Sequence, residues 1–443
     1  MKRLDFTIPV LGKPARQLSS VSKKQDIWRT SYVGDDQYIL YDISLSGDPP
    51  SLDNTQHNLI EKAGPRENIY FDPSKVHAGI VTCGGLNDVI RAIVMTLWYR
   101  YGTKRISGFM YGYRGLLSKF NLPAMELNPG VVSNIHRLGG TILGASRGYG
   151  DCVEEIVDSL ERMNINMLFT IGGDGTQKGA LDISEEVKKR GLKISIVGIP
   201  KTIDNDLSFV QRSFGFETAV SRAVDAVACA HVEAHDGVNG IGIVKVMGRE
   251  SGFIAANTAM AINDVNYVLI PEVRFDLEGE NGLFASLERR LKQRNHAVIL
   301  VAEGAGQEYM KDSRATDASG NVKFNDIGIF LKERIGEYFK VRGIDINLKY
   351  IDPSYMIRSA PANSNDSVYC AKLGAYVVHA AMAGKTGMIV SLIHSHFVHV
   401  PIQLAVSGRK HIDPHQELWR DVIEATGQPL LLQERRIKPR TKD

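Results

Sequence analysis

Apolar runs and amphipathic segments alternate along the chain from His77 onward, and this alternation predicts a series of βαβ units. The run INMLFTI (165–171) is apolar on both faces, as buried parallel strands are. The next stretch, TQKGALDISEEVKKRG (176–191), has apolar residues at helical spacing, cations in its last turn and a final glycine, so it predicts a helix ending near Gly191. KISIVGIP (193–200) is the next expected strand.

The same order of strand, turn and helix recurs elsewhere, which predicts an α/β fold with two Rossmann-like αβα sandwich domains and parallel-rich sheets. Residues 1–73 are polar and punctuated by proline and glycine, and we expect them to form an N-terminal extension. The first domain is expected over 74–209, completed by about 376–402, and the second over 210–375, with 403–443. The other expected units comprise HAGIVTCGG (77–85), LNDVIRAIVMTLWYRYG (86–102), RISGFMYGYRG (105–115), NGIGIVKVMGRESGFIAANTAMA (239–261) and AVILVAEGAGQ (297–307).

A glycine-rich turn, IGGDGTQKGA (171–180), lies where the strand ends and the helix begins. Ligands bind at this edge of open α/β sheets, and a helix N-terminus offers free N–H groups to an anion. Gly172, Gly173 and Gly175 can adopt positive φ angles that bring backbone N–H groups close to a phosphate. Asp174 would repel that phosphate unless a Mg²⁺ ion lay between them, so the turn predicts a magnesium–phosphate site. An ordinary tight turn is the alternative reading.

The loop GIPKTIDNDL (198–207) follows the next strand and carries groups suited to phosphoryl transfer. Asp204 and Asp206 are both candidates for a general base that accepts a proton from a hydroxyl. Lys201 and Thr202 supply a cation and a hydroxyl for the charge on a moving phosphoryl group. For one of the two aspartates, a helix N-cap with Asx turns remains the alternative.

These two loops resemble motifs of the phosphofructokinase family. VKVMGRESGF (244–253), VAEGAGQ (301–307) and KYIDPSYMIR (349–358) match further motifs in the order that the family has them, and GYRGL and LGASRG add to the match. The resemblance covers about 77–401. It is closest to the longer ATP-dependent enzymes of plants, protists and some bacteria, which have a similar N-terminal extension.

The resemblance implies transfer of the γ-phosphoryl group of ATP to the 1-hydroxyl of fructose 6-phosphate, which yields fructose 1,6-bisphosphate. The first domain would bind the nucleotide, with Mg²⁺ held by Asp174. Asp204 would be the base, with Thr202 and Ile203 in the same loop and Lys201 beside the transferring group. The residues implied for ATP are Gly84, Arg147, Gly148, Gly173, Asp174, Gly175 and Thr176.

For the acceptor, the resemblance implies a sugar-phosphate site in the second domain. Arg249 would bind the acceptor and also stabilise the transition state, and Arg358 would bind the 6-phosphate with a planar guanidinium. The family completes this site from a neighbouring subunit, which implies a homo-oligomer, either a dimer or a tetramer. The other implied residues are Met247, Gly248, Glu303 and Tyr355, with Lys349 and Tyr350 as candidates for the reach into the neighbour.

Two positions bear on the phosphoryl donor. Diphosphate-dependent members of the family carry an aspartate where Gly175 stands, whereas bacterial ATP-dependent members carry a glycine where Lys201 stands. An aspartate at 175 would place bulk and a like charge near the α-phosphate of ATP, at a cost of about 4 kcal/mol for 4 Å and an effective dielectric near 20. Lys201 helps either donor. Gly175 therefore favours ATP, with a diphosphate-dependent enzyme as the alternative.

The first phosphate loop departs from the family pattern, because TCGG runs directly into LNDVIR and about four residues are missing between Gly85 and Leu86. A shorter loop offers fewer backbone N–H donors to ATP, at a cost of about 1.5–3 kcal/mol for each charge-assisted bond. An impaired or regulatory paralogue is therefore a further alternative. NAD and diacylglycerol kinases share the GGDGT turn, but they lack the PKTIDND and MGR pair.

Composition bears on the classes of partner and on the cellular compartment. The net charge of +3 over 443 residues does not indicate a nucleic-acid binder, and no apolar run reaches the roughly 18 residues that cross a membrane. The four cysteines form no C-x-x-C pair, which favours a reducing compartment, so we expect a cytoplasmic protein. His394, His396 and His399 lie close together near a predicted hairpin, but strand-end histidines near water explain them better than a metal site.

Overall fold

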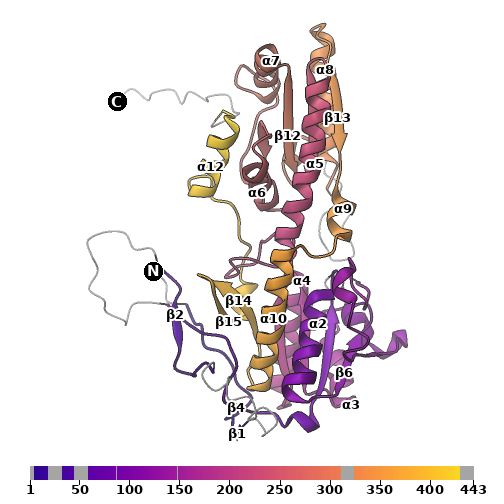
Figure 1. The fold of residues 1–443 in the computed structure, drawn as a ribbon, viewed down its shortest axis with the longest axis vertical. Helices are drawn as coiled ribbons and strands as arrows, with labels where there is room; N and C mark the ends of the chain where they lie inside the picture. The colour runs from indigo at the N-terminus through magenta and orange to yellow at the C-terminus, as the bar shows by residue number, and fades with distance from the viewer. Residues whose placement is uncertain are drawn as a thin grey trace, which may run out of the picture. The chain divides into compact units, whose positions relative to one another are not determined.

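The computed structural model describes residues 4–17, 32–43, 58–85, 87–146, 148–310 and 324–429. The chain forms two compact units, Met1–Phe216 with Ser359–Arg409 and Glu217–Arg358 with Lys410–Asp443 (Figure 1). These bounds differ from the expected domains mainly at residues 359–375, which lie in the first unit. Helix α10 (Ser364–Met382) begins in this stretch and packs against α2 (Asn87–Met95) and β9 (Ser195–Pro200).

The first unit is built on a seven-stranded sheet in the order β15-β14-β9-β8-β5-β6-β7. Its central neighbours are parallel, and the edge pairs β14–β15 and β6–β7 are antiparallel. This confirms the expected parallel-rich sheet. The remaining strands are β5 (His77–Thr82), β6 (Arg105–Phe109), β7 (Met125–Glu126), β8 (Met167–Gly172), β14 (Met388–Ile393) and β15 (His396–Pro401).

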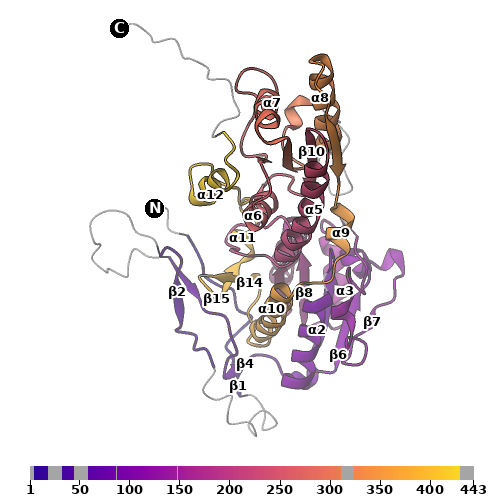
Figure 2. The same ribbon diagram turned by 45° about the horizontal axis from the view of Figure 1, so that its top comes forward.

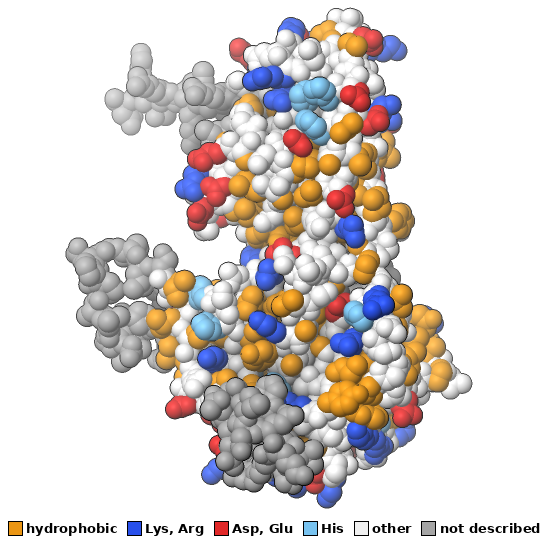
Figure 3. Space-filling view, viewed as in Figure 1, with side chains coloured by type: hydrophobic (Ala, Val, Ile, Leu, Met, Phe, Trp, Pro, Cys, Tyr) orange, Lys and Arg blue, Asp and Glu red, His pale blue; other side chains and the backbone are white. Residues whose placement is uncertain are grey.

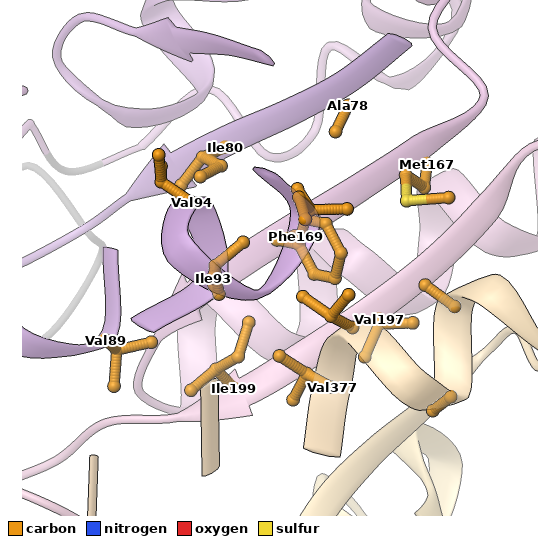
Figure 4. Close-up of a cluster of buried hydrophobic side chains, with 14 of the residues drawn as sticks. Ala78, Ile80, Val89, Ile93, Val94, Met167, Phe169, Val197, Ile199 and Val377 are labelled. Carbon is orange, nitrogen blue, oxygen red and sulfur yellow. The ribbon is translucent and has the colours of Figure 1, made fainter. Parts of the chain in front are cut away.

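Helices cover both faces of this sheet, because successive residues of the buried strands point to opposite sides. Phe169 and Ile199 pack with α2 and α10 on one face, as Figure 4 shows, whereas Leu168 and Ile196 pack with the helices of the other face. Figures 1 and 2 show α2 and α10 side by side. The other helices of this unit are α3 (Val153–Arg162), α4 (Asp174–Lys189) and α11 (Ile402–Ala405), with short helices η3 (Pro73–Lys75), η4 (Thr96–Tyr101), η5 (Gly112–Leu116), η6 (Ser118–Phe120) and η7 (Ile135–Arg137).

The predicted end of helix α4 is confirmed: its last turn contains Lys188 and Lys189, and Gly191 follows with a φ of +68°. Two other expectations need correction. The helix expected over 86–102 becomes a π-helical turn at η4, and the strand expected over 105–115 ends at Phe109, after which the chain forms η5.

The second unit contains a parallel four-stranded sheet in the order β11-β12-β10-β13. Helices α7 and α8 pack on the face that carries Ile241 and Ile243. Helix α5 lies over the opposite face, where Ala230 approaches Gly242 so closely that no larger residue fits. The elements are α5 (Phe216–Asp236), β10 (Gly240–Val246), α6 (Phe253–Ile262), β11 (Tyr267–Leu269), α7 (Leu283–Arg294), β12 (His296–Ala302), η8 (Gln307–Tyr309), α8 (Ile327–Val341), β13 (Asn347–Ile351), α9 (Ser354–Ser359) and α12 (Glu417–Thr426).

The N-terminal region packs on the first unit, with Ile8, Ile60 and Ile69 buried in its two cores. Its short strands are β1 (Arg16–Gln17), which pairs with β4 (Asn68–Ile69), and β2 (Tyr38–Leu40), which pairs with β3 (Leu59–Glu61). Ala63 N donates to Phe397 O of β15 at 2.8 Å, so the segment after β3 is attached to the sheet edge.

A buried ion-pair network reinforces this attachment. One oxygen of Glu61, Oε1, accepts from Arg66 at 2.7 Å and from Lys385 at 2.8 Å, and lies 3.1 Å from Nδ1 of His399. Burial would raise the pKa of Glu61, but the hydrogen bonds and charges of His399 and Lys385 hold it well below its usual range. His399 thus belongs to a structural network, and His394 lies in the hairpin turn with its ring bonded to Tyr41 O.

The surface is mixed in charge. On the face drawn in Figure 3, acidic and basic side chains are interspersed with apolar ones. Within the described ranges, no helix is both long and apolar enough to span a bilayer.

Replacing Glu61 by Gln is expected to destabilise the first unit by about 3–5 kcal/mol at pH 7, because the buried cations Arg66 and Lys385 lose their buried counter-ion and keep only the exposed Asp35. The folded pKa of Glu61 is depressed, so its contribution is present above the unfolded Glu pKa of about 4.3 and is lost as pH falls below it. The difference between the two proteins should therefore shrink below about pH 4.3. Urea unfolding of both from pH 7 to pH 3 measures this, and a difference that grows in acid would contradict it.

Candidate functional site

Three sequence-predicted loops meet at one edge of the first sheet, because β5, β8 and β9 are parallel neighbours and end together. Cys83 N, in the loop after β5, donates to Ile171 O at 2.9 Å, and Lys201 N, after β9, donates to Gly172 O at 2.9 Å. The glycine turn after β8 therefore lies between the TCGG and PKTIDND loops.

The glycine turn leads directly into helix α4, with Gly173 at the N-cap and no side-chain cap. The expected positive φ angles are wrong here: Gly173 has a φ of −84°, and neither Gly172 nor Gly175 lies in the left-handed region. Close approach is the reason for glycine instead. A Cβ on Gly172 would lie 2.2 Å from Oγ1 of Thr176, and one on Gly173 would lie 3.3 Å from Lys201 O.

Asp174, the first residue of α4, is surrounded by positive charge. Its Oδ2 lies 2.9 Å from Nζ of Lys178 and 3.5 Å from Nη2 of Arg409. A Cβ added to Gly175 would have no protein atom within 4 Å, so space is open beside the carboxylate. One carboxylate with room for phosphate oxygens fits the usual coordination of Mg²⁺. Among the described residues, no three His, Cys, Asp or Glu side chains are arranged to hold a metal by themselves.

Internal hydrogen bonds hold the PKTIDND loop. Thr202 Oγ1 accepts from Asp204 N at 3.2 Å and donates to Asp206 Oδ1 at 3.1 Å. Asn205 has a φ of +53°, and its side chain accepts from Ser213 N at 2.9 Å. The N-cap reading of either aspartate is wrong, since the next helix, α5, begins only at Phe216.

The first phosphate loop lies beside Lys201. A Cβ on Gly84 would lie 3.0 Å from Nζ of Lys201, and Gly84 has a φ of +141°, which few other residues adopt. Asn87, at the start of α2, donates to Leu138 O and accepts from Ile142 N, so the shortened loop leads straight into an anchored helix. Leu86 and Arg147 lie outside the described residues.

Gly148, which directly follows Arg147 in the sequence, has a φ of +87°. Two residues later, Gly150 packs on Gly179 of α4, since a Cβ on Gly150 would lie 3.4 Å from the Cα of Gly179. The segment 148–150 therefore runs along the helix that carries Asp174.

The acceptor residues expected in the second unit gather at the carboxyl ends of β10 and β12. Glu303 N donates to Val246 O at 2.9 Å, and Gly304 N donates to Gly248 O at 3.0 Å. Gly248 has a φ of +131°, and a Cβ on Gly304 would overlap Arg249 O at 1.8 Å. The MGR and AEG motifs are thus locked together by backbone contacts.

Glu303 is half-buried beside several cations. Burial raises the pKa of Glu303, and the positive charges of Arg358 and Arg249 oppose this shift. Lys245, on β10, bonds Asp326 at 2.6 Å and Asp352 at 2.9 Å. Burial would lower the pKa of Lys245, but the hydrogen bonds to its partners raise it, so this lysine stays charged.

The remaining residues expected to bind the sugar phosphate differ in how much they contact their own unit. Tyr350 donates its hydroxyl to Asp326 at 2.9 Å and covers Gly328, so its side chain contacts its own unit. Lys349 and Arg358 are exposed, and Tyr355 is 86% exposed.

Sequence reasoning missed three residues that organise these sites. Gln177, fully buried, donates Nε2 to Gly172 O and Ile199 O at 3.1 Å each and to Thr170 O at 3.3 Å, which ties the ends of β8 and β9. Lys245 had a visible signal, a charge inside the apolar run GIGIVKVMG. Arg409 had none, since it follows its carboxylate partners by more than 200 positions.

Comparison with known proteins gives consistent matches. The chain matches the family model described as phosphofructokinase over residues 77–381. It is 54% identical over 440 residues to the ATP-dependent 6-phosphofructokinase of Borreliella burgdorferi, covering 97% of this chain and 98% of the relative. It is 47% identical over 423 residues to the ATP-dependent 6-phosphofructokinase of Trypanosoma brucei brucei, covering 93% and 86%.

Solved structures agree in fold. The pyrophosphate-dependent phosphofructokinase of Marinobacter aquaeolei superposes with a TM-score of 0.65 at 19% identity, covering 81% of this chain and 92% of that one. Phosphofructokinase of Pichia pastoris gives a TM-score of 0.61 at 18% identity, covering 98% of this chain and 45% of that one. At these identities the likeness concerns the fold alone.

Gln177→Leu is expected to lower the free energy of unfolding by about 1–3 kcal/mol, because the amide that joins β8 to β9 is lost. Gln177→Glu should cost more, since a buried carboxylate would face backbone carbonyls that cannot donate to it. Urea denaturation midpoints of the three proteins measure this order. A Glu variant as stable as the native protein would contradict the assigned contacts.

Proposed function

Since the chain belongs to the phosphofructokinase family, we propose that it transfers the γ-phosphoryl group of ATP to the 1-hydroxyl of fructose 6-phosphate. The observation that carries this assignment is the meeting of the Asp174 turn and the Asp204 loop at one sheet edge, through the bond from Lys201 N to Gly172 O. The turn proposed to bind the phosphoryl donor and the loop proposed to carry the base are thus neighbours within one unit.

The donor binds at the start of α4. The first N–H groups of this 16-residue helix donate to phosphate oxygens, and the missing side chain of Gly175 leaves room for them. Gly84 and Gly148 are assigned to the nucleotide by family resemblance. Asp174 would hold Mg²⁺, whose charge would offset that of the phosphates. Thr176 is fixed in this turn because its carbonyl accepts the buried hydroxyl of Tyr113 at 2.7 Å. Arg147 is assigned to the nucleotide by family resemblance only.

Asp204 acts as the general base. Asp204 N donates to Thr202 Oγ1, and the same hydroxyl donates to Asp206 Oδ1. These bonds orient Asp204 before substrate binds. Lys201 lies beside Gly84, where its ammonium group can stabilise charge on the transferring phosphoryl group. Ile203 contributes apolar lining, and its Cγ2 would lie 3.4 Å from a Cβ on Gly215.

The second unit binds the acceptor. Met247, Gly248 and Arg249 contact the sugar phosphate, and Glu303 accepts hydrogen bonds from its hydroxyls. Arg358 and Tyr355 on α9 bind the 6-phosphate. The exposure of Lys349 and Tyr355 supports a homo-oligomer in which a neighbouring subunit completes the site. We also propose a cytosolic location, which the unpaired state of all four cysteines supports.

Gly175 supports ATP as the donor, whereas Lys201, which the chain shares with the diphosphate-dependent members, helps either donor. A Cβ at position 175 would meet no crowding protein atom. The charge of an aspartate there, rather than steric conflict with the protein, would therefore discriminate against ATP.

A coupled assay tests the function directly. With Mg²⁺ and fructose 6-phosphate, we expect fructose 1,6-bisphosphate to form with ATP and not with diphosphate. Asp204→Asn should lower kcat at least 100-fold and leave fructose 6-phosphate binding unchanged, because only the proton acceptor is lost. Asp206→Asn is the matched control. Product formed only with diphosphate would refute the donor assignment, and near-normal turnover of Asp204→Asn would move the base to Asp206. Absence of product with either donor would favour a regulatory paralogue.

Substitutions at Gly175 test donor selection. Gly175→Ala should keep kcat/KM for ATP within about threefold, since its methyl group meets open space. Gly175→Asp should lower it by about three decades through repulsion of roughly 4 kcal/mol. An acid in the first turn of a helix is favourable, so thermal unfolding should show no loss of stability. Equal effects of the two substitutions would show that charge is not the discriminator.

A further inference from the structure

Arg409 lies against the PKTIDND loop although it is distant in sequence. Its backbone pairs with Leu207 in an isolated antiparallel bridge, and Ser208 Oγ donates to Gly408 O at 2.9 Å. Arg409 is the last residue of the first unit, and its side chain is only 25% exposed. These contacts fix the backbone of Arg409, from which the side chain with its guanidinium extends.

The guanidinium lies between carboxylates of two different loops. Nη2 is 3.5 Å from Oδ2 of Asp174, in the turn after β8, and Nε is 4.0 Å from Oδ2 of Asp206, in the loop after β9. Both carboxylates have side chains that are 13% exposed, so solvent screens their mutual repulsion only in part. A single cation that faces both of them offsets this repulsion and relates the two loops to each other.

We propose that Arg409 is a positioning residue of the donor site, which makes the site select the metal–nucleotide complex over the bare divalent ion. The inference rests on the proposed function, because Asp174 is taken as the magnesium residue. A carboxylate already paired with a guanidinium attracts a free cation less, whereas the same guanidinium attracts a polyphosphate. Arg409 acts through Asp174 and Asp206, and both loops lose their common partner without it.

Lys178 provides a matched comparison. It also pairs with Asp174, at 2.9 Å, but it does so along the same helix at i,i+4 and its side chain is 56% exposed. Such exposed pairs contribute little, and no contact joins Lys178 to the second loop in the described structure. Removal of either residue deletes one cation near Asp174, so a difference between the two variants isolates the bridging role.

The test measures metal binding without turnover. Binding of Mn²⁺ alone is followed by electron paramagnetic resonance, and binding of metal-free ADP by calorimetry, for the native protein, Arg409→Ala, Arg409→Lys and Lys178→Ala. We expect Arg409→Ala to bind bare Mn²⁺ at least tenfold more tightly and ADP at least tenfold more weakly. Arg409→Lys should be intermediate, because its single ammonium lacks the planar fork. Lys178→Ala should stay within threefold of the native protein.

Steady-state kinetics and one further variant separate the two hypotheses. Arg409→Ala should raise KM for Mg-ATP at least tenfold while KM for fructose 6-phosphate stays within threefold. If Asp174→Asn still binds Mn-ATP normally, the assignment of Asp174 in the proposed function fails. If Asp174→Asn loses that binding but Arg409→Ala and Lys178→Ala behave alike, the proposal for Arg409 is overturned. Arg409→Gln, which keeps side-chain length, replaces the alanine variant if thermal unfolding shows that the latter does not fold.

Discussion

The alignment of three parallel strand ends is the constraint on which the first unit's chemistry depends. Strands β5, β8 and β9 pair side by side and stop at one edge, and the bonds from Cys83 N to Ile171 O and from Lys201 N to Gly172 O extend this pairing into the loops. A carboxylate at a helix N-terminus and a loop with two aspartates become neighbours as a consequence. The buried amide of Gln177 adds a side-chain tie across the same edge.

Charge is managed differently in the two units. In the first, Asp174 lies near Lys178 and Arg409, and a Cβ on the adjacent Gly175 would meet open space. In the second, Lys245 lies between Asp326 and Asp352, and Glu303 is half-buried near Arg358 and Arg249. In each arrangement a charged group lies among groups of the opposite sign before a ligand binds, and such preorganised charge limits reorganisation when charge moves during a reaction.

Much of this arrangement followed from local patterns. The strand expected over 165–171 and observed as β8 at 167–172, helix α4 with its cationic end and Gly191, and the parallel-rich sheet were predicted from apolar periodicity and end signals, because those signals act within a few residues. Predictions failed where a neighbour decided the backbone. Gly172 and Gly173 are required by contacts with Thr176 and Lys201 rather than by positive φ angles, and those contacts depend on packing.

By itself, the sequence determined the family, and it predicted the positions of a phosphate-binding turn and a proton-accepting loop and two residues that bear on the phosphoryl donor. Only the tertiary structure revealed Arg409 between Asp174 and Asp206, the amide of Gln177 across two strands, and the attachment of the N-terminal region through Glu61 and Lys385. The physical reason is distance along the chain. Backbone propensity and periodicity are local, whereas ion pairs and buried hydrogen bonds join residues that only the folded sheet brings together.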